Sequence, residues 1–235
     1  MKKILTTTAI ALAAFTTSFA QDTDLKPEKG ANNLELNFVP LNGKPIQLTY
    51  IRYRKFLSPT TAFRLGIGLS FSSNKADSVF ASGLSANTNI NGTYKKTQMG
   101  WNIKPGFEHH YAGTNRLSPY SGLELDIAGA STKEQTPLGL DATDAVIIRT
   151  DKNQNKGGFF RIGVNLLAGF DCYVTKHLYL GTELGFGFQM VKYSDFKSTT
   201  NILATGATDP DAVKQGSEMN IGPNFNSSIR LGYIF

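Results

Sequence analysis

The residues that could do chemistry in this sequence are few, and their spacing does not assemble a reactive site. His109 and His110 are adjacent, and neighbours on a strand point to opposite faces, so the pair cannot readily bind one metal ion. A serine hydrolase needs a serine, a histidine and an acid to converge. Glu108 and His110 share a face, but the sequence places no serine beside them. We therefore expect no catalytic residue.

Segment 151–157 resembles the start of a calcium-binding loop. Such a loop needs a glycine at its sixth position and an acid at its twelfth, where this chain has Lys156 and Ile162. Loose calcium binding by the loop acids Asp209 and Asp211 stays open. No glycine-rich phosphate-binding loop followed by a helix is recognisable. We predict no dedicated metal site and no cofactor.

The elements that must position the polar side chains are β-strands. After about residue 32 apolar residues recur at every second position, as in Phe63, Leu65 and Ile67, with Arg64 and Gly66 between them. This alternation is typical of strands whose two faces meet different environments. It recurs in eight segments, 34–38, 46–56, 63–71, 98–108, 122–127, 160–169, 178–189 and 224–235.

Segment 46–56 has an ambiguous register. Ile46, Leu48 and Tyr50 fall on one face of a strand, whereas Ile51 and Tyr53 fall on the other. The alternation alone therefore does not show which face of this segment is apolar.

The connections between these segments alternate in length. Short ones fall near 57–61, 112–117 and 174–177, long polar ones near 72–92, 130–157 and 191–219, and the first, from Pro40 to Pro45, is short where a long one is expected. Short periplasmic turns and long external loops are typical of outer-membrane barrels. An even number of strands then places both termini in the periplasm. The three long loops are the expected contact sites for other envelope proteins, because binding residues usually lie on loops.

The polar faces favour a membrane barrel over a secreted soluble sandwich or a lipocalin-like barrel. They concentrate glycine, which suits the crowded interior of an eight-stranded barrel better than a solvated surface. They also carry charges of both signs that can pair inside a barrel: Arg64, Lys104, Glu108, Glu124, Asp126, Arg161, Asp171, Glu183 and Arg230. We predict an all-β fold, an eight-stranded antiparallel transmembrane barrel with a filled lumen, in the bacterial outer membrane.

The N-terminus has the parts of a secretory signal peptide. Lys2 and Lys3 precede a short apolar stretch, and the small residues Ser18 and Ala20 predict cleavage between Ala20 and Gln21. The predicted organisation is a signal peptide over 1–20, a short periplasmic segment over 21–31 and the barrel over 32–235.

Charge narrows the classes of partner. The formal net charge of the 235 residues is +6, to which Lys2 and Lys3 contribute two units. So small an excess of positive charge does not predict a nucleic-acid partner, and the expected partner is the lipid of the outer membrane. The single cysteine, Cys172, cannot form an internal disulfide.

The end of the chain carries a further pattern. Leu231, Tyr233 and Phe235 alternate up to a terminal aromatic residue, which resembles the signal recognised by the outer-membrane assembly machinery. With the strand–turn–strand segment 50–66 (YIRYRKFLSPTTAFRLG), it carries the resemblance of the mature chain to small eight-stranded barrels of the OmpX and OmpA type. The chain looks closest to the porin-like or PorT-like β-barrel family common in Bacteroidetes. This resemblance implies an architecture, without shared catalytic or ligand-binding residues.

Three functions stay open on the sequence. A non-enzymatic structural or interaction role in the cell envelope is favoured, because an eight-stranded barrel with paired internal charges is expected to be plugged. A narrow pore or small-molecule conduit would need an open lumen. A lipid-modifying outer-membrane enzyme is the least favoured of the three.

Overall fold

Antiparallel strands make up the regular structure of this chain. The computed structural model describes residues 24–38, 46–81, 89–138, 149–201 and 211–235. Within them lie ten strands: β1 (Asn32–Phe38), β2 (Ile46–Ser58), β3 (Thr61–Ala81), β4 (Asn89–His110), β5 (Leu117–Leu138), β6 (Arg149–Gln154), β7 (Phe159–Tyr173), β8 (Leu178–Tyr193), β9 (Lys197–Asn201) and β10 (Ser217–Ile234). The predicted signal peptide, its cleavage site at Ala20 and Gln21, and the connection at 40–45 lie outside the described residues.

Eight of these strands form a closed ring of hydrogen bonds. Around the ring the order is β1, β2, β3, β4, β5, β7, β8 and β10, and β10 pairs back with β1 from Asn33 opposite Ile234 to Phe38 opposite Ile229. Every neighbouring pair is antiparallel. The prediction of an all-β, eight-stranded antiparallel barrel is therefore confirmed.

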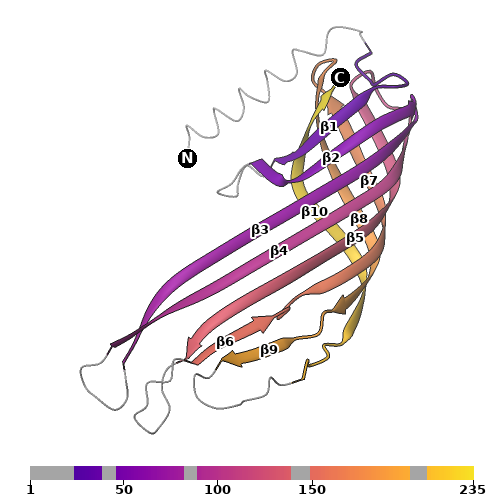
Figure 1. Ribbon diagram of the computed structural model, residues 1–235. Helices are drawn as coiled ribbons and strands as arrows, with labels where there is room; N and C mark the ends of the chain where they lie inside the picture. The colour runs from indigo at the N-terminus through magenta and orange to yellow at the C-terminus, as the bar shows by residue number, and fades with distance from the viewer. Residues whose placement is uncertain (1–23, 39–45, 82–88, 139–148, 202–210) are drawn as a thin grey trace, which may run out of the picture.

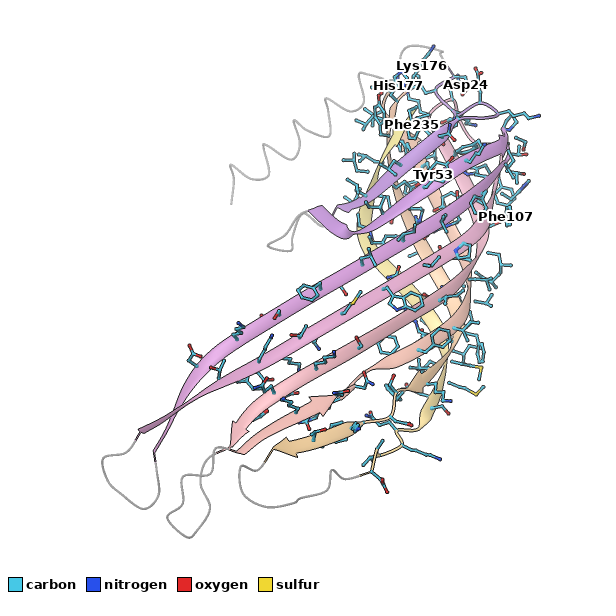
Figure 2. All side chains as sticks on the ribbon, in the orientation of Figure 1. Asp24, Tyr53, Phe107, Lys176, His177 and Phe235 are labelled. Carbon is cyan, nitrogen blue, oxygen red and sulfur yellow. The ribbon has the colours of Figure 1, made fainter. Side chains whose placement is uncertain are left out.

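The short connections and both ends of the described chain lie at one end of the barrel, here called the turn end. Asp24, Lys176, His177 and Phe235 lie close together there (Figure 2). Residues 24–31, which precede β1, cover part of this end, because Leu25 packs against a buried cluster and its backbone N–H donates to the carbonyl of Asn115 at 3.1 Å. That cluster consists of Tyr173, Tyr179 and Ile234.

The prediction of three long loops is wrong for the described parts of these segments, which are largely strand. At the far end of the barrel β3, β4 and β5 continue past the ring and are joined by β6 and β9 (Figure 1). We call this extension, from Ser73, Thr97 and Ser131 outward, the projecting sheet. Beyond the lipid both faces of a sheet meet water, so the apolar alternation that predicts a strand disappears while the pairing continues, as between Ser73 and Thr97.

An irregularity in β2 explains why its register is ambiguous in the sequence. Leu36 of β1 pairs with Ile51, but the next residue, Asn37, pairs with Gln47. The pairing thus skips three residues of β2. Because side chains alternate, an odd offset exchanges the residues that share a face. On the C-terminal side of this shift in β2, Arg52 and Arg54 are buried and Ile51 is exposed.

The outer surface of the ring is apolar and the interior is polar. Phe71 and Ile221 are both 73% exposed, whereas Arg54 and Arg64 are 0% exposed. Exposed apolar side chains extend around the barrel: Ile67, Leu69, Phe71, Met99, Ile103, Phe107, Leu123, Leu125, Phe160, Ile162, Val164, Leu166, Leu184, Phe186, Phe188, Met190, Met219 and Ile221. An apolar surface of this extent indicates contact with lipid.

Glycines on the inner face make room for tyrosine rings. A Cβ added at Gly66 would collide with Tyr50, one at Gly169 with the ring of Tyr120, and one at Gly232 with the ring of Tyr179. In a narrow barrel each ring can point inward only where the facing strand lacks a side chain.

We predict that Gly232→Ala destabilises the barrel by about 1–3 kcal/mol, because the Tyr179 ring has to move in a packed interior. The matched control is Gly222→Ala on the same strand, where an added Cβ has no atom within 4 Å and stability stays unchanged. Urea unfolding in detergent micelles, followed by the fluorescence of the single tryptophan, Trp101, measures both variants. Equal midpoints for the two variants would contradict the packing argument.

Candidate functional site

Arg54 lies at the centre of a buried ionic cluster in the lumen. Its Nε lies 2.6 Å from Glu35 Oε1, its Nη1 2.8 Å from Glu108 Oε2, and its Nη2 2.8 Å from Asp171 Oδ2. The three acids come from β1, β4 and β7. A buried guanidinium is costly to leave unpaired, and this one has a carboxylate at each nitrogen.

Arg64 forms a second centre with a different set of acids. Its Nη1 lies 2.7 Å from Glu183 Oε2 and 2.8 Å from Glu108 Oε1, and its Nη2 lies 2.8 Å from Glu124 Oε2. Tyr120 donates its hydroxyl to Glu183 at 2.6 Å. Glu108 is thus shared between Arg54 and Arg64, which joins the two centres into one network.

Two of these ion pairs span the full width of the lumen. Arg54 on β2 and Asp171 on β7 belong to strands four places apart in either direction around the ring. Arg64 on β3 and Glu183 on β8 are also four places apart. Side chains from diametrically opposite walls therefore meet in the middle of the barrel.

The complete set of these residues is named the lumen charge cluster. It consists of Glu35, Arg52, Arg54, Arg64, Glu108, Glu124, Asp171, Glu183 and Arg230. Arg52 contacts Glu35 and Glu183, and Arg230 contacts Glu35 and Asp171, with all four distances between 2.9 and 3.2 Å. Every member is at most 6% exposed.

All nine charged residues predicted to line the lumen lie inside the barrel, in two groups. Six belong to the lumen charge cluster: Arg64, Glu108, Glu124, Asp171, Glu183 and Arg230. The other three, Lys104, Asp126 and Arg161, form a looser group toward the far end. Arg161 Nη2 lies 3.0 Å from Asp126 Oδ2, whereas Lys104 Nζ stays 3.8–3.9 Å from Glu124 and Asp126.

Sequence analysis missed Glu35, Arg52 and Arg54. A signal for Glu35 was present, since it stands between Leu34 and Leu36 in an alternating segment. The two arginines lie in the segment of ambiguous register, and their pairing with Asn33 and Glu35 on β1, both buried, places them inward.

The structure also places a serine beside His110, which the sequence did not. Ser118 Oγ lies 2.9 Å from His110 Nδ1, and Glu108 Oε2 lies 3.3 Å from His110 Nε2. Ser118 is only 4% exposed, and Glu108 is held by Arg54 and Arg64. The three residues form a buried hydrogen-bonded chain. His109, as alternation requires, is exposed on the other face.

A polar cup lies between the lumen charge cluster and the far end. Its volume is about 480 Å³, and it is lined by Lys104, Asp126, Arg161, Asn165, Gly187, Gln189, Asn220, Ile221, Gly222 and Pro223. Glu124 links the cup to the cluster, because one of its oxygens faces Lys104 and the other binds Arg64. The cup therefore ends on the ionic cluster.

The described residues contain no group of three or more histidine, cysteine or acidic side chains arranged to hold a metal ion. Across the same ranges, no helix has the length and apolar character needed to cross a membrane.

A closed ring of antiparallel strands, apolar outside and ionic inside, defines this chain as a porin-like outer-membrane β-strand protein. Residues 46–199 match the model of the Putative OmpA-OmpF-like porin family, and because the match covers more than half of the 235 residues, the chain belongs to this family. The matched region runs from β2 into β9 and leaves out β1 and β10, the strands that close the ring. A search of curated proteins found no match.

We predict that Arg54→Met destabilises the barrel by about 3–5 kcal/mol, because it leaves Glu35, Glu108 and Asp171 without their shared cation. The control is Lys104→Met in the cup, whose nearest carboxylate oxygen is 3.8 Å away and whose loss is expected to cost less than about 1 kcal/mol. Urea unfolding in micelles compares the two variants. Similar losses would mean that Arg54 is not the centre of the cluster.

Proposed function

We propose that this protein is a closed, non-enzymatic barrel of the bacterial outer membrane with a structural or interaction role in the envelope. The observation that carries the proposal is the pair of contacts across the lumen, Arg54 to Asp171 and Arg64 to Glu183. Guanidinium and carboxylate groups that meet from opposite walls support a filled lumen at that level. Family membership supports the outer-membrane location.

The proposed orientation places the turn end, and with it both termini, in the periplasm. Support comes from the short connections at that end, such as the two residues between Ser58 and Thr61, and from the long strands β3, β4 and β5 at the other end. Outer-membrane barrels have short periplasmic turns and longer external segments. The cleaved signal peptide over 1–20, the assembly signal at Leu231, Tyr233 and Phe235, and the finer kinship with PorT-like proteins belong to this proposal.

The proposed contact region for other envelope proteins is the projecting sheet. It gathers strands from all three segments that the sequence marks as external, 72–92, 130–157 and 191–219, into one surface. Its inner face is polar and ordered by hydrogen bonds, with Tyr94 donating to Glu134 at 2.9 Å. A rigid polar sheet loses little conformational entropy on binding and is suited to a protein partner.

The second candidate function, a small-molecule conduit, is favoured by the cup alone. A cavity of about 480 Å³ is large enough for a small polar solute. The cup ends on Glu124 and Arg64, however, so a solute that enters it would have to displace the lumen charge cluster to pass.

We predict that the refolded full chain in a planar lipid bilayer gives no steady conductance at moderate voltage, because the cross-lumen ion pairs close the bore. Single-channel recording measures this directly, and a known open porin in the same membrane serves as the positive control. Stable channel openings would support the conduit and contradict the closed barrel.

For the interaction role, we predict that a photo-reactive residue at Lys96, on the inner face of the projecting sheet, forms cross-links to another envelope protein in intact cells. The matched control is a photo-reactive residue at Thr175, in the turn between β7 and β8. Mass spectrometry identifies the adducts. Cross-links from Thr175 alone would move the interaction surface to the periplasmic turns.

A further inference from the structure

One face of the projecting sheet carries a lysine from each of its five strands. Lys75, Lys95, Lys133, Lys152 and Lys197 lie on β3, β4, β5, β6 and β9 in turn, and we name them the lysine patch. Their registers place them in two adjacent rows. Lys75 pairs with Lys95, Lys95 with Gln135 and Gln135 with Lys152, while Lys133 pairs with Gln154 and Gln154 with Lys197.

The lysine patch continues the lipid-facing surface of the barrel. Phe71 and Met99 pair with each other on that surface and lie four residues from Lys75 and Lys95 along their respective strands, so all four side chains share one face. At about 3.4 Å per residue the two rows lie about 7 and 14 Å further along the strands. A strand tilt of about 40° reduces this to about 5–10 Å of depth, which is the headgroup layer.

Within the described part of the protein no salt bridge neutralises the positive charges of the patch, and the acid on its face is Asp77, two residues from Lys75 on β3. Lys75 and Lys95 face each other directly, an arrangement of like charges that destabilises a sheet. None of the five lysines forms an ion pair with a described residue. Glu134, which pairs with Lys96, belongs to the opposite face, and Asp77 accepts a hydrogen bond from Thr93 at 2.9 Å.

Three of the lysines also share a cavity. Lys95, Lys133 and Lys152 line a shallow pocket of about 180 Å³ together with Thr97, Gln135 and Gln154, whose side chains are on the same face. Glu134 and Asn153 also line it, but alternation places their side chains on the opposite face, where the Glu134 carboxylate accepts a hydrogen bond from Tyr94. An anionic group seated there would meet three ammonium groups and several neutral hydrogen-bond donors.

We propose that the lysine patch binds phosphate groups of lipids in the outer leaflet. A phosphate group offers several oxygens around one centre of negative charge, which suits ammonium groups converging from neighbouring strands. Long lysine side chains can extend their ammonium groups back toward the bilayer. Such a contact neutralises the facing pair Lys75 and Lys95. The inference rests on the proposed outer-membrane location.

The test uses the refolded full chain in neutral detergent micelles, with bound lipid counted by native mass spectrometry. The probes are phosphatidic acid, phosphatidylcholine with the same acyl chains, and oleate, whose headgroup is a carboxylate. We expect the wild-type protein to bind phosphatidic acid at least about tenfold more tightly than either of the others. The test variant, K95Q/K133Q/K152Q, is expected to lose that preference, because about fivefold per lysine over three lysines exceeds tenfold.

The matched control variant is K29Q/K55Q/K176Q, which removes the same charge from exposed residues at the turn end. It is expected to retain the preference for phosphatidic acid within about twofold. Equal losses of this preference in the two variants would mean that it depends on net charge alone, which would overturn the proposal. An unchanged preference in K95Q/K133Q/K152Q, equally tight binding of oleate, or binding of soluble polyphosphate without phosphatidic acid would also overturn it.

Insertion into phosphatidylcholine vesicles, judged by protease protection, separates this proposal from the membrane assignment. A chain that does not insert contradicts the proposed outer-membrane function itself. A chain that inserts but shows no preference for phosphatidic acid contradicts only the lipid-phosphate site.

Discussion

Arg54 and Asp171 meet from opposite walls of the ring, and the rest of the barrel is arranged so that this contact and its neighbours can form. Each of the eight ring strands supplies at least one side chain to the lumen charge cluster, from Glu35 on β1 to Arg230 on β10. A slip of one residue in any strand would turn its charge toward lipid and an apolar residue toward the cluster. The cluster therefore fixes the register of the whole wall.

The same constraint determines what else the interior can hold. Among the described residues, the cluster together with Lys104, Asp126 and Arg161 comprises six cationic and six anionic side chains, so these charges balance. Tyrosines fill the space around the ions and donate to them, as Tyr179 does to Glu35 at 2.6 Å. Glycines on facing strands give these rings their room. The charged side chains, the tyrosine rings and the glycines therefore pack together in the lumen.

Much of this could be predicted from the sequence, because lipid outside and ions inside impose a strict alternation. That alternation identified eight ring strands and placed residues such as Arg64 and Glu183 in the lumen. It did not identify Arg52 and Arg54, because their segment shows two possible apolar faces and its pairing with β1, which decides between them, is a property of two strands together. The alternation also failed for the projecting sheet, because strands that meet water on both faces have no apolar residue at every second position. It did not identify Ser118 either, because the contact of Ser118 with His110 depends on the pairing of two strands.

The contact between Arg230 and Glu35 joins residues 195 positions apart in the sequence, on the last and the first strand of the ring. Contacts of such separation form late, because the chain entropy lost in closing the intervening segment has to be repaid by pairing already in place. Until β10 takes its place beside β1, Glu35 and Asp171 both lack the guanidinium of Arg230. A partly built barrel therefore carries an interior charge imbalance that only the last strand removes. In this way ring closure and charge neutrality become a single event in assembly, and unfinished intermediates are disfavoured.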